Sequence, residues 1–228
     1  MRTQRFLDIS ISIITLICLL PVFIPIIILL KFTGEGEVIY NQPRIGKNGK
    51  KFGLFKFATM LKNSPTSGAG PITIKDDPRV LPVGRFLRKS KVNELPQLIN
   101  VLVGHMSLVG PRPMTIDTFD IYPINIQNII NSVRPGLSGI GSIIFRDEEK
   151  IISSKLEPFN FYKKSIAPYK ATVEIWFVNN NNLSTYLKVI FCTIWVVFRP
   201  TSKLVWKTFP LIPKPPHDLQ SKLGFLGK

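Results

Sequence analysis

The pattern of hydrophobic positions begins with one long apolar run. Residues Ile9 to Leu30 are 22 consecutive positions without a charge. At about 1.5 Å per residue, a helix of this length extends about 33 Å, enough to cross the core of a bilayer. The run is longer than the apolar region of a signal peptide, and no small-residue cleavage site precedes Lys31. We therefore expect a membrane segment that the mature protein keeps.

Two prolines lie inside this run. Pro21 and Pro25 each remove a helical hydrogen bond and clash with a preceding carbonyl, so a sharp break is expected. Basic residues flank the run on both sides, with Arg5 before it and Lys31 after it, and neither end therefore favours export. We predict a re-entrant membrane helix over residues 1–32, broken at the prolines and with both ends on the cytoplasmic face. An ordinary proline-kinked transmembrane helix is the alternative.

Shorter patterns follow the apolar run. Residues 37–40 and the alternating stretch 51–57 are typical of strands, and residues 42–46 of a turn. Apolar residues at helical spacing predict a buried amphipathic helix over 95–102. The stretch 183–198 contains one charge and is short for a span, so it predicts a core or interfacial helix.

These elements together predict an α/β fold, mostly helical, in a small membrane-associated domain. We assign residues 33–200 to this domain. Residues 201–228 carry prolines, lysines and aromatic side chains, a composition that fits a basic tail at a membrane surface and equally a disordered tail.

Composition and charge narrow the classes of function. The 228 residues are 45% hydrophobic, and 30 Lys and Arg outnumber 14 Asp and Glu, for a net charge of +16. The high hydrophobic fraction excludes a disordered polybasic tail, and a count of only two cysteines excludes a disulfide-stapled secreted domain. The positive charge suits nucleic acid, an anionic membrane or a phosphorylated substrate. No nucleic-acid motif accompanies it, so we expect no nucleic-acid partner.

Candidate chemistry comes from arginines at turns and helix ends. The sequence has no phosphate-binding lysine loop, no dinucleotide fingerprint, no zinc-spaced Cys and His set and no nucleophile elbow. Guanidinium groups beside Pro and Gly are suited to holding phosphate, whereas the alternative for any single arginine is a solvated surface charge. The candidates are Arg44, Arg88, Arg112, Arg134 and Arg146.

The sequence resembles the bacterial sugar transferase family, the monotopic phosphoglycosyl transferases of envelope glycan assembly. The motifs that carry the resemblance are NQPRIG at 41–46, FKFATM at 55–60, DPR at 77–79, GRFLR at 84–88, NELPQL at 93–98, MSLVGPRP at 106–113 and RPG at 134–136. The resemblance implies transfer of a sugar 1-phosphate from a nucleotide diphosphate sugar, usually a UDP-sugar, to polyprenyl phosphate. It also implies Mg2+ as cofactor and a place on the cytoplasmic face of the bacterial inner membrane.

The resemblance fails at one decisive position. Family members use an Asp-Glu pair whose Asp attacks the β-phosphate, and this chain has Asn93 and Glu94 there. An amide cannot form an acyl phosphate as a carboxylate does. As an alternative role, Asn93 suits the N-cap of a helix.

Three explanations of the missing Asp compete. Glu94 attacks phosphorus or holds Mg2+ in a direct transfer; a carboxylate among residues 147–149 completes the site; or the protein is a catalytically impaired relative that binds polyprenyl phosphate or an assembly partner. We favour a working enzyme centred on Glu94. Arg88, Arg112 and Arg134 would then hold phosphates, and Arg44 and Arg146 are further candidates for the substrate site.

Overall fold

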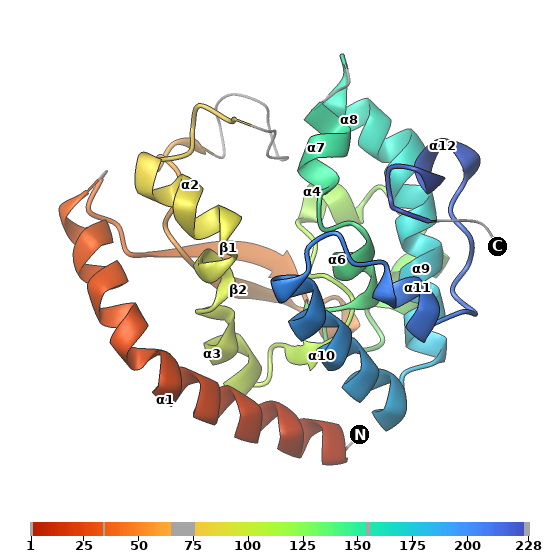
Figure 1. The fold of residues 1–228 in the computed structure, drawn as a ribbon, viewed down its shortest axis with the longest axis horizontal. Coiled ribbons are helices and arrows are strands. Elements are labelled where there is room, and N and C mark those ends of the chain that lie inside the picture. The colour runs from red at the N-terminus through yellow and green to blue at the C-terminus, as the bar shows by residue number, and fades with distance from the viewer. Residues whose placement is uncertain (1, 34, 65–75, 154–155, 226–228) are drawn as a thin grey trace.

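The longest element of the computed structural model is the expected N-terminal helix. The structure describes residues 2–33, 35–64, 76–153 and 156–225, and helix α1 spans Arg2–Phe32. The helix runs through Pro21 and Pro25 without the predicted break, and it bends along its course (Figure 1). Proline removes one amide donor and displaces one carbonyl, which a long helix accommodates as a bend. Among the described residues, α1 alone is long and apolar enough to cross a membrane.

The N-terminal half of α1 is fixed to the rest of the molecule by polar contacts. The carboxylate of Asp8 is buried and accepts hydrogen bonds from Ser107 Oγ at 3.0 Å, Leu108 N at 2.9 Å and Tyr186 Oη at 2.8 Å. The guanidinium of Arg5 donates to two carbonyls at the end of a later helix. The start of α1 is therefore part of the globular domain.

The other end of α1 is fixed by apolar packing. Leu30, Phe57 and Leu87 form a small buried cluster, and Phe23 of α1 packs against it with its ring edge-on to Phe57. Helix α2 (Pro82–Lys89) supplies Leu87. Both ends of α1 thus contact the same domain.

An antiparallel hairpin follows α1. Strands β1 (Ile39–Ile45) and β2 (Lys51–Phe57) pair with Ile39 opposite Phe57 and Ile45 opposite Lys51. The alternation at 51–57 is confirmed as a strand, but the turn expected at 42–46 is wrong, because residues 42–45 belong to β1. The chain reverses instead at the short helix η1 (Lys47–Gly49), where Asn48 and Gly49 have φ angles of 57° and 74°.

A second, smaller sheet is parallel. Strand β3 (Ser107–Val109) lies beside β4 (Gly136–Ser138). The backbones of the two segments come very close, since a Cβ on Gly136 would lie 2.0 Å from the amide nitrogen of Gly110. Only glycine fits at position 136, so the glycine of the RPG motif allows the GPRP segment to pack directly against it.

The remaining elements are helices, and the prediction of a mostly helical fold with small sheets is confirmed. The predicted amphipathic helix is α3 (Gln97–Leu102), preceded by the 3₁₀ helix η3 (Val92–Glu94), and the predicted helix at 183–198 is α10 (Leu183–Phe198). The others are α4 (Ile116–Phe119), α5 (Ile124–Ile130), α6 (Ile140–Ile144), α7 (Glu148–Ser153), α8 (Pro158–Phe161), the π-helix η4 (Tyr162–Ile166), α9 (Ala167–Asn179), α11 (Leu204–Thr208) and α12 (His217–Gln220).

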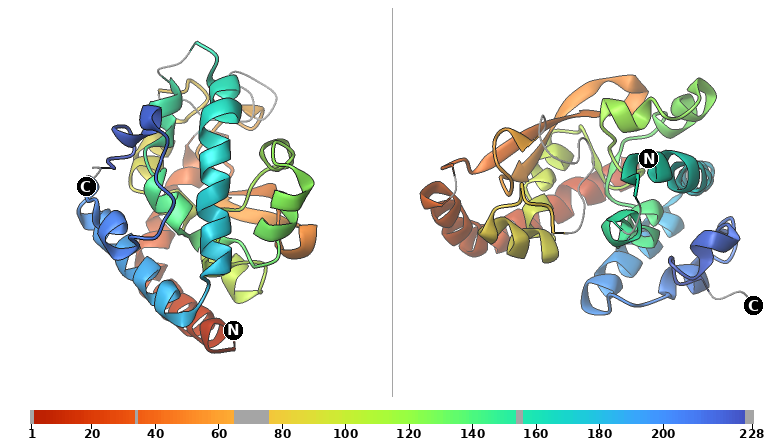
Figure 2. Two further views of the ribbon diagram at one scale, coloured as in Figure 1. Left: turned by 90° about the vertical axis from the view of Figure 1, so that its right-hand side faces the viewer. Right: turned by 90° about the horizontal axis from the view of Figure 1, so that it is seen from above.

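One large core joins these helices. Its buried members come from the hairpin, from α3, from the α6 to α10 region and from the C-terminal segment, which contributes Val205, Phe209, Ile212, Leu219 and Leu223. The described residues after 200 therefore pack on the domain rather than extend from it. Two views show the C-terminal helices against α9 and α10, with the hairpin and the α4 to α5 segment on the opposite side (Figure 2).

Candidate active site

A large polar cleft collects most of the predicted site residues. It has a volume of about 1300 Å³ and lies between the hairpin, α2, η3 and the start of α7. This exceeds the roughly 300–1,000 Å³ of ordinary small-molecule pockets, so it can hold more than one small ligand. The predicted residues that line it are Arg44, Arg88, Asn93, Glu94, Arg112 and Arg146.

Glu94 lies at the meeting point of these elements. Its Oε1 accepts a hydrogen bond from Arg112 Nη2 at 2.7 Å, and Lys56 Nζ lies 4.0 Å from the same oxygen. Burial alone would raise the pKa of Glu94, but the charges of Arg112 and Lys56 outweigh burial and hold that pKa well below its usual range. Glu94 is therefore an anion at every physiological pH. No described residue bonds its Oε2.

Lys56 is a functional candidate that the arginine pattern missed. Strand pairing sets it opposite Tyr40 and turns its side chain into the cleft. Burial lowers its pKa to about 7; Glu94 opposes the shift, and the charges of Arg44, Arg112 and Arg88 add to it. Immediately around Glu94, the basic side chains of Lys56, Arg44 and Arg112 thus outnumber the one carboxylate, which favours an anionic ligand at this point of the cleft. The FKFATM motif, which contains Lys56, was the available signal.

Arg44 and Arg88 approach the cleft from two sides. Arg44 donates to the Pro113 carbonyl at 3.1 Å and to Gln42 Oε1 at 2.6 Å, and its buried Nε has no hydrogen-bond partner among the described residues. Burial, followed by the charge of Arg112, lowers the pKa of Arg44 to about 10. Arg88 Nη2 contacts Glu149 Oε1 at 3.0 Å. Arg44 is thus fixed in place, while Arg88 is held by the exposed carboxylate of Glu149 and by Met60 Sδ, 3.7 Å from its Nη1.

Arg146 and Arg134 have structural partners. Arg146 lines the cleft and donates to the Val196 carbonyl near the end of α10, a favourable place for a cation at a helix C-terminus. Arg134 does not line the cleft, and its Nε donates to the Gly104 carbonyl at 2.8 Å. The structure therefore brings four of the five candidate arginines to the cleft and places Arg134 elsewhere.

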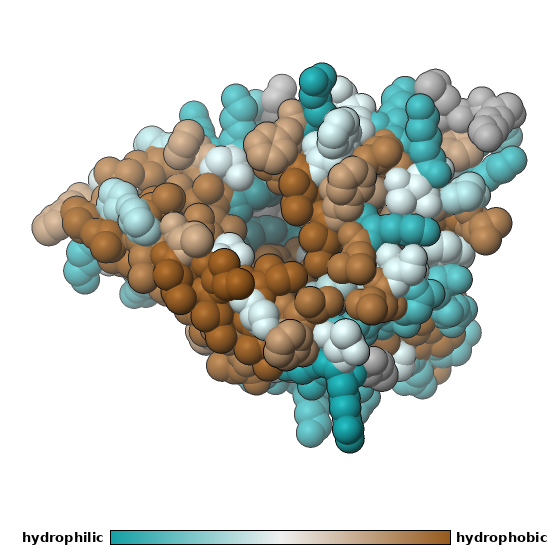
Figure 3. Space-filling model, turned by 60° about the horizontal axis from the view of Figure 1, so that its bottom comes forward, coloured by the Kyte–Doolittle hydropathy of each residue, from teal (hydrophilic) through white to brown (hydrophobic). Residues whose placement is uncertain are grey.

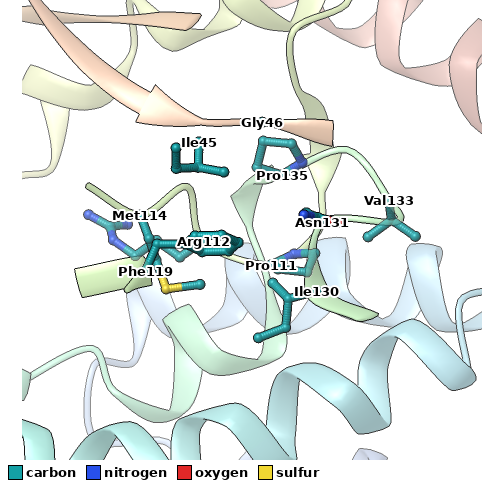
Figure 4. Close-up of a pocket in the computed structure, with 10 residues that line it drawn as sticks. All are labelled: Ile45, Gly46, Pro111, Arg112, Met114, Phe119, Ile130, Asn131, Val133 and Pro135. Atoms are coloured by element: carbon teal, nitrogen blue, oxygen red, sulfur yellow. The ribbon is translucent and has the colours of Figure 1, made fainter. Parts of the chain in front are cut away.

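A small cavity beside the GPRP segment is too small for a substrate. It has a volume of about 10 Å³, the space of a single water, between the end of β1 and the residues around Pro111 and Pro135 (Figure 4). Ile45, Ile130 and Val133 give it apolar walls. Arg112 also lines this cavity, so the residues around it pack against Arg112.

Asn93 is not the N-cap that was its alternative role. It lies inside η3, whose N-cap is Lys91 in a left-handed conformation, and α3 begins after Pro96. The side chain of Asn93 is buried and lines the cleft, and in the part of the chain that the structure describes its Oδ1 has no hydrogen-bond partner. A neutral amide thus occupies the position of the missing carboxylate.

The acidic residues 147–149 are divided among three partners. Asp147 pairs with Lys150 at 3.0 Å and Glu149 with Arg88, whereas Glu148 accepts two hydrogen bonds from the buried Lys170. Burial opposes a charge on Lys170, but Glu148 outweighs it and raises the pKa of Lys170. All three carboxylates line the cleft, Asp147 and Glu149 at its exposed edge and Glu148 in contact with a buried lysine.

Glu174 of α9 is a second residue that sequence reasoning missed. It is 2% exposed, lines the cleft, and neither carboxylate oxygen makes a hydrogen bond within the described part of the chain. Burial raises its pKa to about 7, and the charge of Lys170 opposes the rise. Nothing in its local sequence distinguishes Glu174 from a surface residue.

The expected Mg2+ fits the site only with help from a substrate. Among the described residues, no three His, Cys, Asp or Glu side chains are grouped as a metal site. Glu94 offers one permanently charged carboxylate with Oε2 unbonded. Mg2+ is commonly held by one or two carboxylates together with substrate phosphates and water, so Glu94 suits that kind of binding.

Comparison with known proteins decides the family. A model of the family described as bacterial sugar transferase matches residues 1–200. The chain belongs to the bacterial sugar transferase family. The resemblance noted on the motifs is thus confirmed, and with it the enzyme class, a phosphoglycosyl transferase, and association with a membrane.

Curated relatives cover the chain to different extents. It is 38% identical over 160 residues to exopolysaccharide production protein ExoY of Sinorhizobium fredii, covering 64% of the chain and 70% of the relative. It is 33% identical over 217 residues to undecaprenyl-phosphate galactose phosphotransferase of Salmonella typhimurium, covering 87% of the chain and 42% of the relative.

A third relative carries a different sugar in its name. The chain is 37% identical over 144 residues to UDP-N-acetylgalactosamine-undecaprenyl-phosphate N-acetylgalactosaminephosphotransferase of Aeromonas hydrophila, covering 62% of the chain and 34% of the relative. The chain therefore spans less than half the length of the longer curated relatives it matches.

Proposed function

We propose that the chain transfers a sugar 1-phosphate from a UDP-sugar to polyprenyl phosphate and so begins the assembly of an envelope polysaccharide. The observation that carries this proposal is the cationic cleft around Glu94, with Lys56, Arg44, Arg88 and Arg112 directed at one volume. Two substrates that both carry phosphate bring negative charge together, and fixed guanidinium and ammonium groups offset it. Relatives named as undecaprenyl-phosphate sugar phosphotransferases support these substrates.

Glu94 is better suited to hold Mg2+ than to attack phosphorus. Its Oε1 is held by Arg112, and its lowered pKa makes it a weak base and a weak nucleophile. When bound, Mg2+ would neutralise charge on the diphosphate. Arg88 and Arg112 would orient the two phosphate groups, and Lys56 would balance the charge of the donor.

With Asn93 in place of a carboxylate, we infer a direct transfer. An oxygen of the lipid phosphate attacks the β-phosphorus of the UDP-sugar and forms the new P–O bond. The bond from that phosphorus to the bridging oxygen breaks, and UMP leaves with the electron pair. No proton has to move and no bond to the protein forms, so the reaction is compatible with a neutral amide at position 93.

A second candidate function is supported by the same residue. Asn93 would equally suit a catalytically impaired relative that binds polyprenyl phosphate or an assembly partner. The two are separated by incubating the full chain in membranes with undecaprenyl phosphate, Mg2+ and a panel of UDP-sugars, and measuring UMP release. Release with one sugar, abolished in Glu94→Gln, supports the enzyme; binding of the lipid without release from any sugar supports the impaired relative.

We further propose that α1 is re-entrant and that the domain lies on the cytoplasmic face of the inner membrane. Support comes from the contacts of both ends of α1 with one domain: Asp8 bonds Ser107 and Tyr186, and Leu30 packs on Leu87. A helix that crossed the bilayer would separate these ends. Cysteines introduced at positions 3 and 220 should react with an impermeant thiol reagent from the same side of the membrane.

A further inference from the structure

A short turn with its own hydrogen bonds carries Asn93. In η3, Glu94 N donates to the Lys91 carbonyl at 3.1 Å. Leu95 N donates to the Val92 carbonyl at the same distance. Lys91, the N-cap of this turn, has a left-handed φ of 62°. Local bonds and the N-cap conformation thus fix the backbone from which the Asn93 side chain extends.

The side-chain amide of Asn93 bonds none of the described residues. Asn93 is 5% exposed, and its Oδ1 is fully buried without a donor. Its Nδ2 makes no hydrogen bond within the described part of the chain either, but it is not fully buried. Because Asn93 lines the cleft, Nδ2 is the amide atom that faces it. Buried polar groups nearly always have partners, so an unpaired amide at a cleft indicates a ligand that bonds it.

The charges around Asn93 favour an anion as that ligand. Glu94, the next residue, accepts a hydrogen bond from Arg112 at 2.7 Å, and Lys56 Nζ lies 4.0 Å from the same oxygen. Arg88 of α2 lines the same cleft. An ionised phosphate offers only acceptors, whereas an amide nitrogen offers two N–H donors. The Asn93 amide, with Nδ2 toward the cleft, is therefore complementary to a phosphate oxygen.

A neutral donor in a fixed position acts differently from the cations around it. A space-filling view shows a hollow with hydrophilic residues at its floor and hydrophobic residues around it (Figure 3). The cations of the cleft attract a diphosphate before and during reaction, whereas an uncharged amide adds little to that attraction. The non-bridging oxygens of a phosphate spread into a plane as phosphorus becomes five-coordinate. A donor that meets an oxygen only in this geometry lowers the barrier without tightening substrate binding.

We propose that Asn93 is a catalytic residue whose Nδ2 donates a hydrogen bond to a non-bridging oxygen of the β-phosphate in the transition state. This inference rests on the proposed function for the reaction. An oxygen of the lipid phosphate forms the new bond to the β-phosphorus while the bond to the bridging oxygen breaks, and UMP takes the electron pair. The amide keeps both of its protons and exchanges no bond. Its part is to stabilise the charge on one oxygen.

Two variants test the donor. Asn93→Ala removes the amide, and Asn93→Leu replaces it by a side chain of similar size without a donor. The full chain is assayed in vesicles with undecaprenyl phosphate and the UDP-sugar that supports UMP release. Both variants should lower kcat about 100-fold and change KM for the UDP-sugar by less than about twofold. Asn128→Ala, which removes an exposed amide on α5 outside the cleft, is the matched control and should act as wild type.

A merely structural role of Asn93 gives a different result. The amide bonds none of the described residues, so Asn93→Leu should keep the melting temperature of wild type in detergent. A loss of kcat accompanied by a matching loss of melting temperature in both variants would overturn the proposal. A raised KM for the UDP-sugar with unchanged kcat would show that the amide binds the ground state, and this would also overturn it.

A sulfur-substituted donor identifies the oxygen that Asn93 bonds. In two diastereomeric analogues of the UDP-sugar, sulfur replaces one or the other non-bridging oxygen of the β-phosphate, and sulfur is a weak acceptor. One diastereomer should slow wild type about tenfold more than it slows Asn93→Leu. Replacing Mg2+ by Mn2+ relieves a loss caused by metal coordination and should leave this difference unchanged. Equal effects of both diastereomers on the two proteins would overturn the proposal.

The outcomes separate this inference from the proposed function. UMP release by wild type with unchanged kcat in Asn93→Ala and Asn93→Leu would keep the proposed function and overturn the role of Asn93. No UMP release by wild type from any UDP-sugar would overturn both.

Discussion

Arg112 Nη2 donates to Glu94 Oε1 at 2.7 Å across the floor of the cleft. The pair joins the start of the NELPQL motif to the GPRP motif, 18 residues later. Each partner stabilises the charge of the other, since Glu94 raises the pKa of Arg112 and Arg112 is the main charge that lowers the pKa of Glu94. Loss of Glu94 leaves the partly buried guanidinium of Arg112 without its carboxylate partner, and loss of Arg112 leaves Glu94 with only the more distant Lys56.

Glu94→Gln should therefore reduce transfer about 100-fold or more, because the amide neither binds Mg2+ as a carboxylate does nor compensates Arg112. UMP release from the UDP-sugar measures the effect. Glu157→Gln, which removes an exposed carboxylate outside the cleft, is the control and should act as wild type. Near wild-type UMP release by Glu94→Gln would reject the assignment of Glu94.

Asn93→Asp should change the kinetic mechanism. A carboxylate at this position supplies the nucleophile that family members use, so a donor labelled in its β-phosphate should leave label on the protein. The wild-type chain and Asn93→Ala should acquire none, and the wild type should show the initial-velocity pattern of a ternary complex. Label on the wild-type protein would contradict direct transfer.

Arg88 and Arg134 offer a contrast between a residue in the cleft and one outside it. Arg88→Met should reduce transfer about 100-fold, because a cation that faces the substrate phosphates is lost. Arg134→Met should retain most of the activity, since Arg134 bonds the Gly104 carbonyl away from the cleft. Equal losses in the two variants would show that this cleft is not the reaction site.

Asp8→Ala should destabilise the domain by about 3 kcal/mol, because Ser107, Leu108 and Tyr186 lose a charged acceptor. Thermal unfolding in detergent measures the change. Ser12→Ala is a matched control in the same helix, since the buried Ser12 hydroxyl bonds none of the described residues. Asp8→Asn keeps an oxygen acceptor and should lose less than Asp8→Ala. Equal stability of all three variants would mean that the contacts of Asp8 do not hold α1.

Glu174→Gln should remove a pH dependence of stability. The folded-state pKa of Glu174, about 7, lies above its ordinary value of 4.5, so the folded chain binds more protons between these pH values. The free energy of unfolding therefore falls as pH rises through this window, by up to about 3 kcal/mol. In thermal unfolding, the melting temperature of Glu174→Gln minus that of wild type should be larger at pH 8 than at pH 5. For Glu157→Gln, the same difference should not change between the two pH values. A constant difference between the variant and wild type at both pH values would contradict the burial of a titrating carboxylate.

The sequence by itself determined the features that depend on short stretches of chain. Hydropathy located α1, the alternation at 51–57 located β2, and α10 has the predicted bounds. The motifs identified the family and directed attention to Asn93. Local periodicity and motif spacing contain this information because a helix or strand follows mainly from its own residues.

Only the tertiary structure decided which charged groups meet. Strand pairing directs Lys56 into the cleft, whereas Arg134 lies outside it and bonds a backbone carbonyl. Glu174 is buried by elements that are distant in sequence. The start of α1 belongs to the domain because Asp8 reaches Tyr186, 178 residues later. Burial and charge pairing depend on neighbours in space, and the long-range contacts that bring these neighbours together are absent from any local pattern.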